Sequence, residues 1–195
     1  MQEKKKIKDL FSAENKSVVL VPLDKKRISE ILYGFPSSPF GLCFIALCGG
    51  GILEIAFIKA EEKSLYLKKL KTRFPQAVIQ EDYGKTRDAV SAVFQTEKRS
   101  AAAPFRVLAE GTVFQMTVWN ALLLIPYGRT VSYKDIAEFI GRPGACRAVG
   151  NAVGSNPAAW LIPCHRVINA DGRPGNYRWG RALKEILLNH ESSFL

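Results

Sequence analysis

The hydrophobic pattern changes near the middle of the chain, and this change limits the fold more than any other feature. Before residue 100, short apolar runs of strand length alternate with stretches of helical periodicity. After residue 104, helical periodicity dominates. Between them, residues 100–104 read Ser-Ala-Ala-Ala-Pro, which is typical of a linker. We therefore predict an α/β protein with two domains, at residues 1–103 and 104–195.

The first half contains a clear hairpin signal. Residues 42–47 and 52–58 are apolar and are separated by three glycines at 49–51, which favours two strands joined by a glycine turn. The glycines and Glu54 interrupt this stretch too often for a membrane span, so we expect no membrane partner. The pattern also predicts strands at 17–21 and 77–79 and helices at 61–74 and 87–94.

The second half predicts a helix-turn-helix. Helical periodicity covers residues 112–125, 132–140, 145–154 and 181–190. Ser132 is suited to cap the second of these helices, and residues 141–144 (Gly-Arg-Pro-Gly) force a turn before the third. A helix, a short turn and a second helix form the layout of a DNA-binding helix-turn-helix, although many helical hairpins bind nothing.

The helix predicted at 145–154 is rich in small residues. Its one basic side chain is Arg147, and Ala145, Ala148, Gly150 and Asn151 offer little reach toward base edges. Small side chains let a helix lie close against a groove, which favours contact by shape over sequence readout. The alternative is that alanine and glycine simply permit tight helix packing.

The charge of the chain favours a polyanionic partner. The formal net charge is +10 and the sequence pI is about 9.6, which fits either a nucleic-acid-binding protein or a merely soluble basic one. From Pro104 onward there are 2 Lys and 8 Arg, against 14 Lys and 4 Arg before it. Because the arginine fork donates two parallel hydrogen bonds to phosphate, specific anion contacts are expected in the second half.

The cysteines indicate a reduced, intracellular protein without a metal site. Cys43, Cys48, Cys146 and Cys164 form no CxxC pair, and the two histidines complete no zinc pattern. Buried free thiols explain the first two cysteines. We expect no metal and no cofactor.

The most reactive local cluster is Cys164-His165-Arg166, which apolar residues flank on both sides. Burial of such groups is costly unless they have partners, and a free thiol needs activation before it attacks. In an extended segment, neighbouring side chains point to opposite sides, so we expect a water to bridge the thiol and the imidazole. Glu185 and Glu191 are both candidates to orient His165. A buried bystander cysteine is the alternative.

Residues 162–167, Ile-Pro-Cys-His-Arg-Val, resemble the active-site signature of the O6-alkylguanine-DNA alkyltransferase family. Further matches are GTVFQ at 111–115, VW at 118–119, IPYG at 125–128, VSY at 131–133, RAVG at 147–150, NP at 156–157 and GNYRWG at 175–180. The resemblance covers about residues 105–191 and is faint before that. It implies an N-terminal ribonuclease H-like α/β domain and a C-terminal helical, winged-helix-like domain.

The resemblance also implies roles for matched residues. Cys164 would accept the alkyl group, His165 would take its proton through a water, and Glu191 would orient His165. Asn156 would hold the arrangement and Tyr133 would donate to the departing guanine. Arg147 would fill the gap left by a base that rotates out. The base would lie among residues predicted to bind substrate: Tyr177, Val167, Arg147, Arg178 and Trp160. The duplex would meet Arg147, Tyr133, Ala145, Ala148, Gly150 and Asn151.

The implied function is DNA repair by a monomer that acts once per molecule. Its partner would be double-stranded DNA containing O6-alkylguanine, contacted in the minor groove with little sequence specificity. Three alternatives stay open: a damage sensor without catalysis, a transcription regulator, and a cysteine protease. The joint presence of four residues argues against the sensor: Cys164, His165, Asn156 and Glu191. The small-residue helix argues against a regulator that reads sequence.

Overall fold

The computed structural model describes residues 7, 9–11, 17–95 and 103–193. The chain forms two compact units. The sheet unit comprises residues 17–110 and 157–159, and the helical unit comprises residues 111–156, those from 160 onward and those before 17. The mixed α/β class predicted from the sequence is confirmed. Among the described residues, no helix is both long and apolar enough to cross a membrane.

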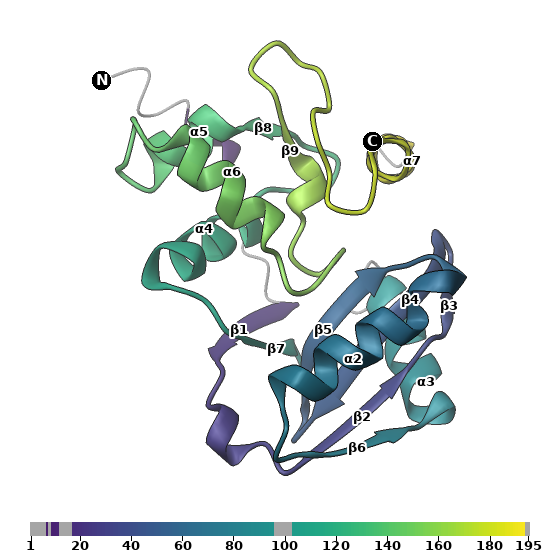
Figure 1. The fold of residues 1–195 in the computed structure, drawn as a ribbon. Coiled ribbons are helices and arrows are strands. Elements are labelled where there is room, and N and C mark those ends of the chain that lie inside the picture. The colour runs from purple at the N-terminus through teal and green to yellow at the C-terminus, as the bar shows by residue number, and fades with distance from the viewer. Residues whose placement is uncertain (1–6, 8, 12–16, 96–102, 194–195) are drawn as a thin grey trace. The chain divides into compact units, whose positions relative to one another are not determined.

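The sheet unit is built on one mixed sheet with the strand order β1-β7-β5-β4-β2-β6, and β3 pairs with β4 (Figure 1). Its strands are β1 (Val18–Pro22), β2 (Glu30–Gly34), β3 (Ser37–Ser38), β4 (Gly41–Cys48), β5 (Gly51–Phe57), β6 (Val78–Glu81) and β7 (Phe105–Ala109). The predicted hairpin is confirmed as the antiparallel pair β4–β5, the glycine turn having positive φ at Gly49 and Gly50. Parallel pairs join β1 to β7, β5 to β7 and β2 to β6.

Two helices cover opposite faces of this sheet (Figure 1). Helix α2 (Lys63–Arg73) packs Tyr66 on Phe44 of β4, with ring centroids 5.2 Å apart. Helix α3 (Tyr83–Phe94) packs Phe94 near Phe57 of β5. Because Phe57 pairs with Cys43, the residue before Phe44, the two aromatic contacts lie on different faces. Helix α3 begins four residues before the predicted start, because Asp82 caps it through the backbone N–H of Lys85 at 2.8 Å.

The division between the two compact units falls a few residues after the boundary predicted at Pro104. Strand β7 follows Pro104 directly and belongs to the sheet unit, where Val107 pairs with both Leu20 and Ile52. The division therefore falls after Glu110. Residues 100–102 of the predicted linker lie outside the described residues. A short return segment, residues 157–159, also pairs with the sheet through Ile55.

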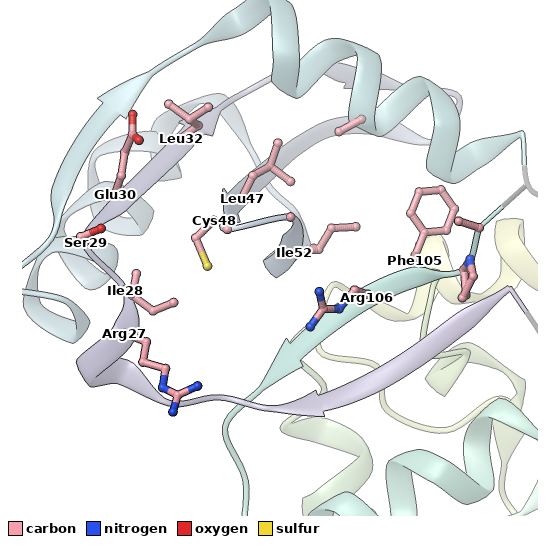
Figure 2. Close-up of a pocket in the computed structure, with 16 residues that line it drawn as sticks. Arg27, Ile28, Ser29, Glu30, Leu32, Leu47, Cys48, Ile52, Phe105 and Arg106 are labelled. Carbon is pink, nitrogen blue, oxygen red and sulfur yellow. The ribbon is translucent and has the colours of Figure 1, made fainter.

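A cavity of about 530 Å³ lies at the hairpin end of the sheet unit (Figure 2). Ile28, Ile52 and Phe105 supply apolar walls, and the guanidinium of Arg106 lies at its side. No residue that the sequence predicts to carry chemistry lines this cavity. The residues that the sequence predicts to carry chemistry lie in the helical unit.

The helical unit contains α4 (Val113–Leu123), β8 (Val131–Ser132), α5 (Tyr133–Phe139), α6 (Cys146–Gly154), the 3₁₀ turn η4 (Cys164–Arg166), β9 (Val167–Ile168) and α7 (Arg181–Ser192). Capping boxes start α4, through Thr112 and Gln115, and α5, through Ser132 and Asp135. The indole of Trp119, nearly fully buried on α4, donates to the carbonyl of Ala152 on α6 at 2.8 Å. The predicted helix-turn-helix is confirmed as α5, a turn with Gly141 at φ 72°, and α6.

Candidate active site

The sulfur of Cys164 lies beside a cavity of about 300 Å³ in the helical unit. Cys164 itself is only 3% exposed, because η4 sits between buried residues on both sides. The cavity is lined by Tyr133, Gly150, Val153, Gly154, Cys164, Asn176, Tyr177 and Arg178. Helix α6 thus supplies one wall, and the segment 176–178 supplies another. A thiol at such a cavity is the strongest feature of the site.

The side-chain amide of Asn156 fixes the Cys164 sulfur. Its Nδ2 lies 2.9 Å from Sγ of Cys164 and 2.8 Å from the carbonyl oxygen of Ile162. Burial raises the pKa of the Cys164 thiol. Three contacts lower it: the hydrogen bond from Asn156, the charge of Lys184 and the hydroxyl of Tyr177. Since burial outweighs these contacts, the resting thiol is protonated at neutral pH and needs a base when it reacts.

His165 is the candidate for that base. Its Nε2 lies 2.7 Å from Oε1 of Glu191, and both side chains are essentially fully buried. Because an ionised carboxylate only accepts, Nε2 carries the proton and the lone pair falls on Nδ1. Nδ1 makes no hydrogen bond within the described part of the chain. Burial lowers the pKa of His165 despite the nearby Glu191, so the ring stays neutral near pH 7.

The local backbone around the cysteine differs from the prediction. The sequence predicts an extended segment, but Cys164, His165 and Arg166 form the 3₁₀ turn η4. In such a turn successive side chains diverge by about 120° rather than pointing to opposite sides, because three residues complete one turn. Trp160 at φ 69° precedes this turn, and its ring stacks on His165 with centroids 5.5 Å apart.

Arg166 is a partner of Glu191 that the sequence analysis missed. Its Nε and Nη2 lie 2.9 Å from Oε2 and Oε1 of Glu191, and Nη1 donates to the carbonyl of Ile125 at 2.6 Å. Burial alone would raise the pKa of Glu191, but His165 and Arg166 lower it to about 2. The sequence signal that could have predicted this pair is the rule that a buried arginine needs a carboxylate partner. Glu185 instead pairs with Arg181 at the surface, so Glu191 is the one of the two candidates that contacts His165.

Lys184 is a second buried cation, and no sequence pattern selects it. Its Nζ donates to the carbonyls of Val167 and Pro174, each at 2.5 Å. Burial lowers the pKa of Lys184 to about 8, and the nearby Cys164 opposes this shift. Lys184 therefore ties β9 to the loop before the segment 176–178 that lines the cavity.

The other predicted site residues fall into two groups. Tyr133, Tyr177 and Arg178 line the cavity, and Arg178 also donates to the carbonyl of Asn156 at 3.0 Å. Trp160 and Val167 do not line it: Trp160 packs on His165, and Val167 is buried. On α6, the residues predicted to meet DNA are mostly accessible: Arg147, Ala148 and Asn151 are exposed, Ala145 is half-buried, and Gly150 lies against the ring of Tyr133.

Fold and site together define a protein with a helix-turn-helix and, in the same unit, a cysteine at a cavity followed by a buried histidine that contacts a carboxylate. Residues 113–193 match the family model described as 6-O-methylguanine DNA methyltransferase, DNA binding domain. A methylated-DNA–protein-cysteine methyltransferase of Methanosarcina acetivorans is 38% identical over 161 residues, covering 83% of this chain and 98% of that protein. The chain therefore belongs to the methylated-DNA–protein-cysteine methyltransferase family, which confirms the resemblance seen in its motifs.

Other relatives agree with this assignment. The crystal structure of the Mycobacterium tuberculosis O6-methylguanine methyltransferase matches with a TM-score of 0.66 and 36% identity, covering 84% of this chain and 93% of that one. The Salmonella typhimurium regulatory protein ada is 36% identical over 172 residues, which cover 84% of this chain and 46% of that protein. The chain thus spans about half the length of that regulatory protein.

Proposed function

We propose that this protein repairs DNA by moving the alkyl group from O6 of a damaged guanine in duplex DNA onto Sγ of Cys164, once per molecule. The observation that carries the proposal is the Cys164 thiol at the cavity between α6 and segment 176–178, with Asn156 on the sulfur. A flipped-out base needs such a pocket, because its O6 atom is inaccessible within the base stack. The DNA itself supplies the alkyl group, so the reaction requires no cofactor.

The proposed reaction is an in-line displacement. The Cys164 proton passes through a water to Nδ1 of His165, and Glu191 stabilises the imidazolium that forms. A sulfur lone pair forms the S–C bond while the C–O6 bond breaks, and the electron pair of that bond goes to the guanine. The guanine gains one proton for the one that the thiol loses. The thioether product is stable, which is why each molecule acts once.

Tyr133 assists the departure of the guanine. Burial raises the pKa of its hydroxyl, and Cys164 raises it further, so the phenol keeps its proton at neutral pH. From the wall of the cavity it donates to the guanine as negative charge develops there. Tyr177 and Arg178 wall the base pocket. Val167 supports the pocket through its carbonyl, which accepts from Lys184, and Trp160 acts by holding the His165 ring.

The helical unit docks on DNA through α6. In this arrangement α5 and α6 form a winged-helix-like helix-turn-helix, and the sheet unit resembles ribonuclease H. The small residues Ala145, Ala148 and Gly150 let α6 approach the minor groove closely. Asn151 contacts the sugar-phosphate backbone of the DNA. Arg147 enters the stack where the base has left and offsets part of the unstacking cost. Contacts of this kind carry little sequence specificity, and a monomer suffices for them.

The proposal is tested by incubating the protein with a duplex that carries one O6-methylguanine. Peptide mass mapping should find one added methyl per protein, on the peptide that contains Cys164, and the duplex should regain guanine. The same duplex without the lesion is the control and should leave the protein unchanged. Binding of the damaged duplex without any methyl on Cys164 would instead support a damage sensor and overturn the proposal.

The neutral state of His165 predicts a particular pH dependence of transfer. Because burial lowers the pKa of His165 below its ordinary 6.5, the ring remains a base down to that pH. We expect the single-turnover rate constant at saturating DNA to stay level from neutral pH down to 6.5 and to fall only at lower pH. The His165→Gln variant should be slow and should lack this acid limb. A midpoint above pH 7 in the wild type would contradict the assigned base.

A further inference from the structure

Within the described part of the chain, Trp160 is the one residue other than glycine whose φ is positive. Its φ of 69° lies in a region that bulky side chains rarely adopt. Backbone of this kind persists only where the surrounding contacts fix it, and it occurs most often at functional sites. The side chain is 7% exposed, and its ring lies 5.5 Å from the His165 ring with planes inclined by 5°. The strained residue thus holds an indole against the imidazole of the proposed base.

The charges around His165 are unbalanced once its ring takes up a proton. Nε2 contacts Glu191 at 2.7 Å, but the same carboxylate accepts from Arg166 at 2.9 Å. The Nζ of Lys184 donates to two backbone carbonyls nearby. Burial lowers the pKa of His165 most, and the charges of Arg166 and Lys184 lower it further, against Glu191. One carboxylate would therefore face the imidazolium and Arg166 together, with a third cation close by.

The Cys164 thiolate offsets this positive charge only until it reacts. As the S–C bond forms, the negative charge of the sulfur passes to the departing guanine, and the imidazolium remains beside Arg166. An aromatic face supplies negative potential without a hydrogen bond and without a group that titrates. Tryptophan is the most effective aromatic side chain in this respect and acts within about 6 Å of its ring centroid. The His165 ring lies within that range.

We propose that Trp160 is a positioning residue whose indole face stabilises the imidazolium form of His165 and so assists proton transfer from Cys164. The inference rests on the proposed function, because it requires His165 to be the base. The step moves one proton from Sγ of Cys164 to Nδ1 of His165 and changes no other bond. Trp160 acts only through the imidazole, since it does not line the cavity beside the sulfur.

A second imidazole near the indole supplies the control. His190 of α7 is half-buried, and its ring centroid lies 6.0 Å from that of Trp160 with planes inclined by 53°. It is the other titratable ring against the same indole, so its own titration has to be separated from that of His165. The His190→Gln variant removes it and should leave both the transfer rate and its acid limb unchanged.

Fluorinated tryptophans incorporated at position 160 alone test the electrostatic role. Each fluorine withdraws electron density from the indole face and nearly keeps its shape, so packing is preserved while attraction for a cation weakens. The single-turnover rate at saturating DNA should fall stepwise with each added fluorine, to about tenfold below the wild type for the most fluorinated ring. The pKa of His165, followed by NMR without DNA, should fall in the same order. A rate that is constant along the series would overturn the proposal.

Two ordinary substitutions separate this role from simple packing. Trp160→Leu removes the aromatic face and should slow transfer about tenfold, with the acid limb moved to lower pH because the imidazolium is less stable. Trp160→Phe keeps a weaker face and should recover part of the rate. If Trp160 only shielded His165 from water, Trp160→Leu would hydrate the ring and move the acid limb up toward pH 6.5, which would contradict the proposal.

The same measurements distinguish failure of this inference from failure of the proposed function. A wild type that transfers the methyl group at a rate insensitive to fluorination disproves the role of Trp160 alone. A wild type that transfers no methyl group disproves the proposed function.

Discussion

Replacing Cys164 by serine is expected to abolish alkyl transfer while the protein stays folded and binds DNA. A hydroxyl at this position still accepts from Asn156 and fits the same space, so unfolding free energy should change by only about 1 kcal/mol. Serine is a far weaker nucleophile, and His165 as a single base does not compensate. The single-turnover rate should fall by more than about 10⁴-fold, as when other enzymes lose their nucleophile. This rate is measured by mass analysis of the protein after incubation with methylated duplex.

The matched control for this substitution is Cys146→Ser. Cys146 is the other thiol of the helical unit and is half-buried at the start of α6. Its loss should leave transfer to Cys164 intact, and a mild alkylating reagent followed by mass analysis would reveal whether Cys146 reacts by itself. Methyl appearing on any residue other than Cys164 in the wild type would contradict the assignment of the acceptor. Loss of DNA binding in Cys164→Ser would also contradict the separation of binding from chemistry.

Glu191→Gln is expected to destabilise the protein by about 3–5 kcal/mol, the usual cost of removing one partner from a buried ion pair. The substitution keeps the volume but leaves the guanidinium of Arg166 buried without its counter-charge. It also removes the carboxylate that orients His165, so transfer should slow by at least about 10²-fold. Chemical denaturation measures the first effect, and single-turnover kinetics below the unfolding transition measures the second.

Glu185→Gln is the matched control for this second variant. Glu185 lies on the same helix, α7, but pairs with Arg181 at the surface, and exposed pairs contribute at most about 1 kcal/mol. The acid dependence gives a further check, since the pKa of Glu191 is about 2 in the folded protein against an ordinary 4.5. The stabilisation by Glu191 is therefore complete above pH 4.5 and is lost as the pH falls toward 2. A difference between wild type and Glu191→Gln that stays constant over this range would refute the ion-pair explanation.

Local sequence patterns were sufficient to predict the helices and strands whose start and stop signals lie next to them in the chain. The β4–β5 hairpin has apolar runs on both sides of its glycine turn, and α5 has Ser132 as its cap. The α5–α6 hairpin likewise follows from periodicity and the turn at 141–144. These elements were predictable because the interactions that define them lie within a few residues along the chain.

Elements that depend on distant partners were not predictable. Strands β2 and β7 are five residues long, and the sequence pattern predicts neither of them. Strand β7 exists because β1 and β5, both far away in the sequence, donate and accept its hydrogen bonds. A five-residue run without a turn at either end gives no local sign of such pairing.

The sequence by itself was sufficient to predict Cys164 as the acceptor and His165 as its base, because the two residues are adjacent in one short motif. Only the tertiary structure decided how that motif works. It turns the segment into a 3₁₀ turn, gives Arg166 and His165 the same carboxylate at Glu191, and buries Lys184 beneath Val167. The reason is physical: burial sets the pKa of each group, and burial arises from side chains that approach one another only after the chain has folded.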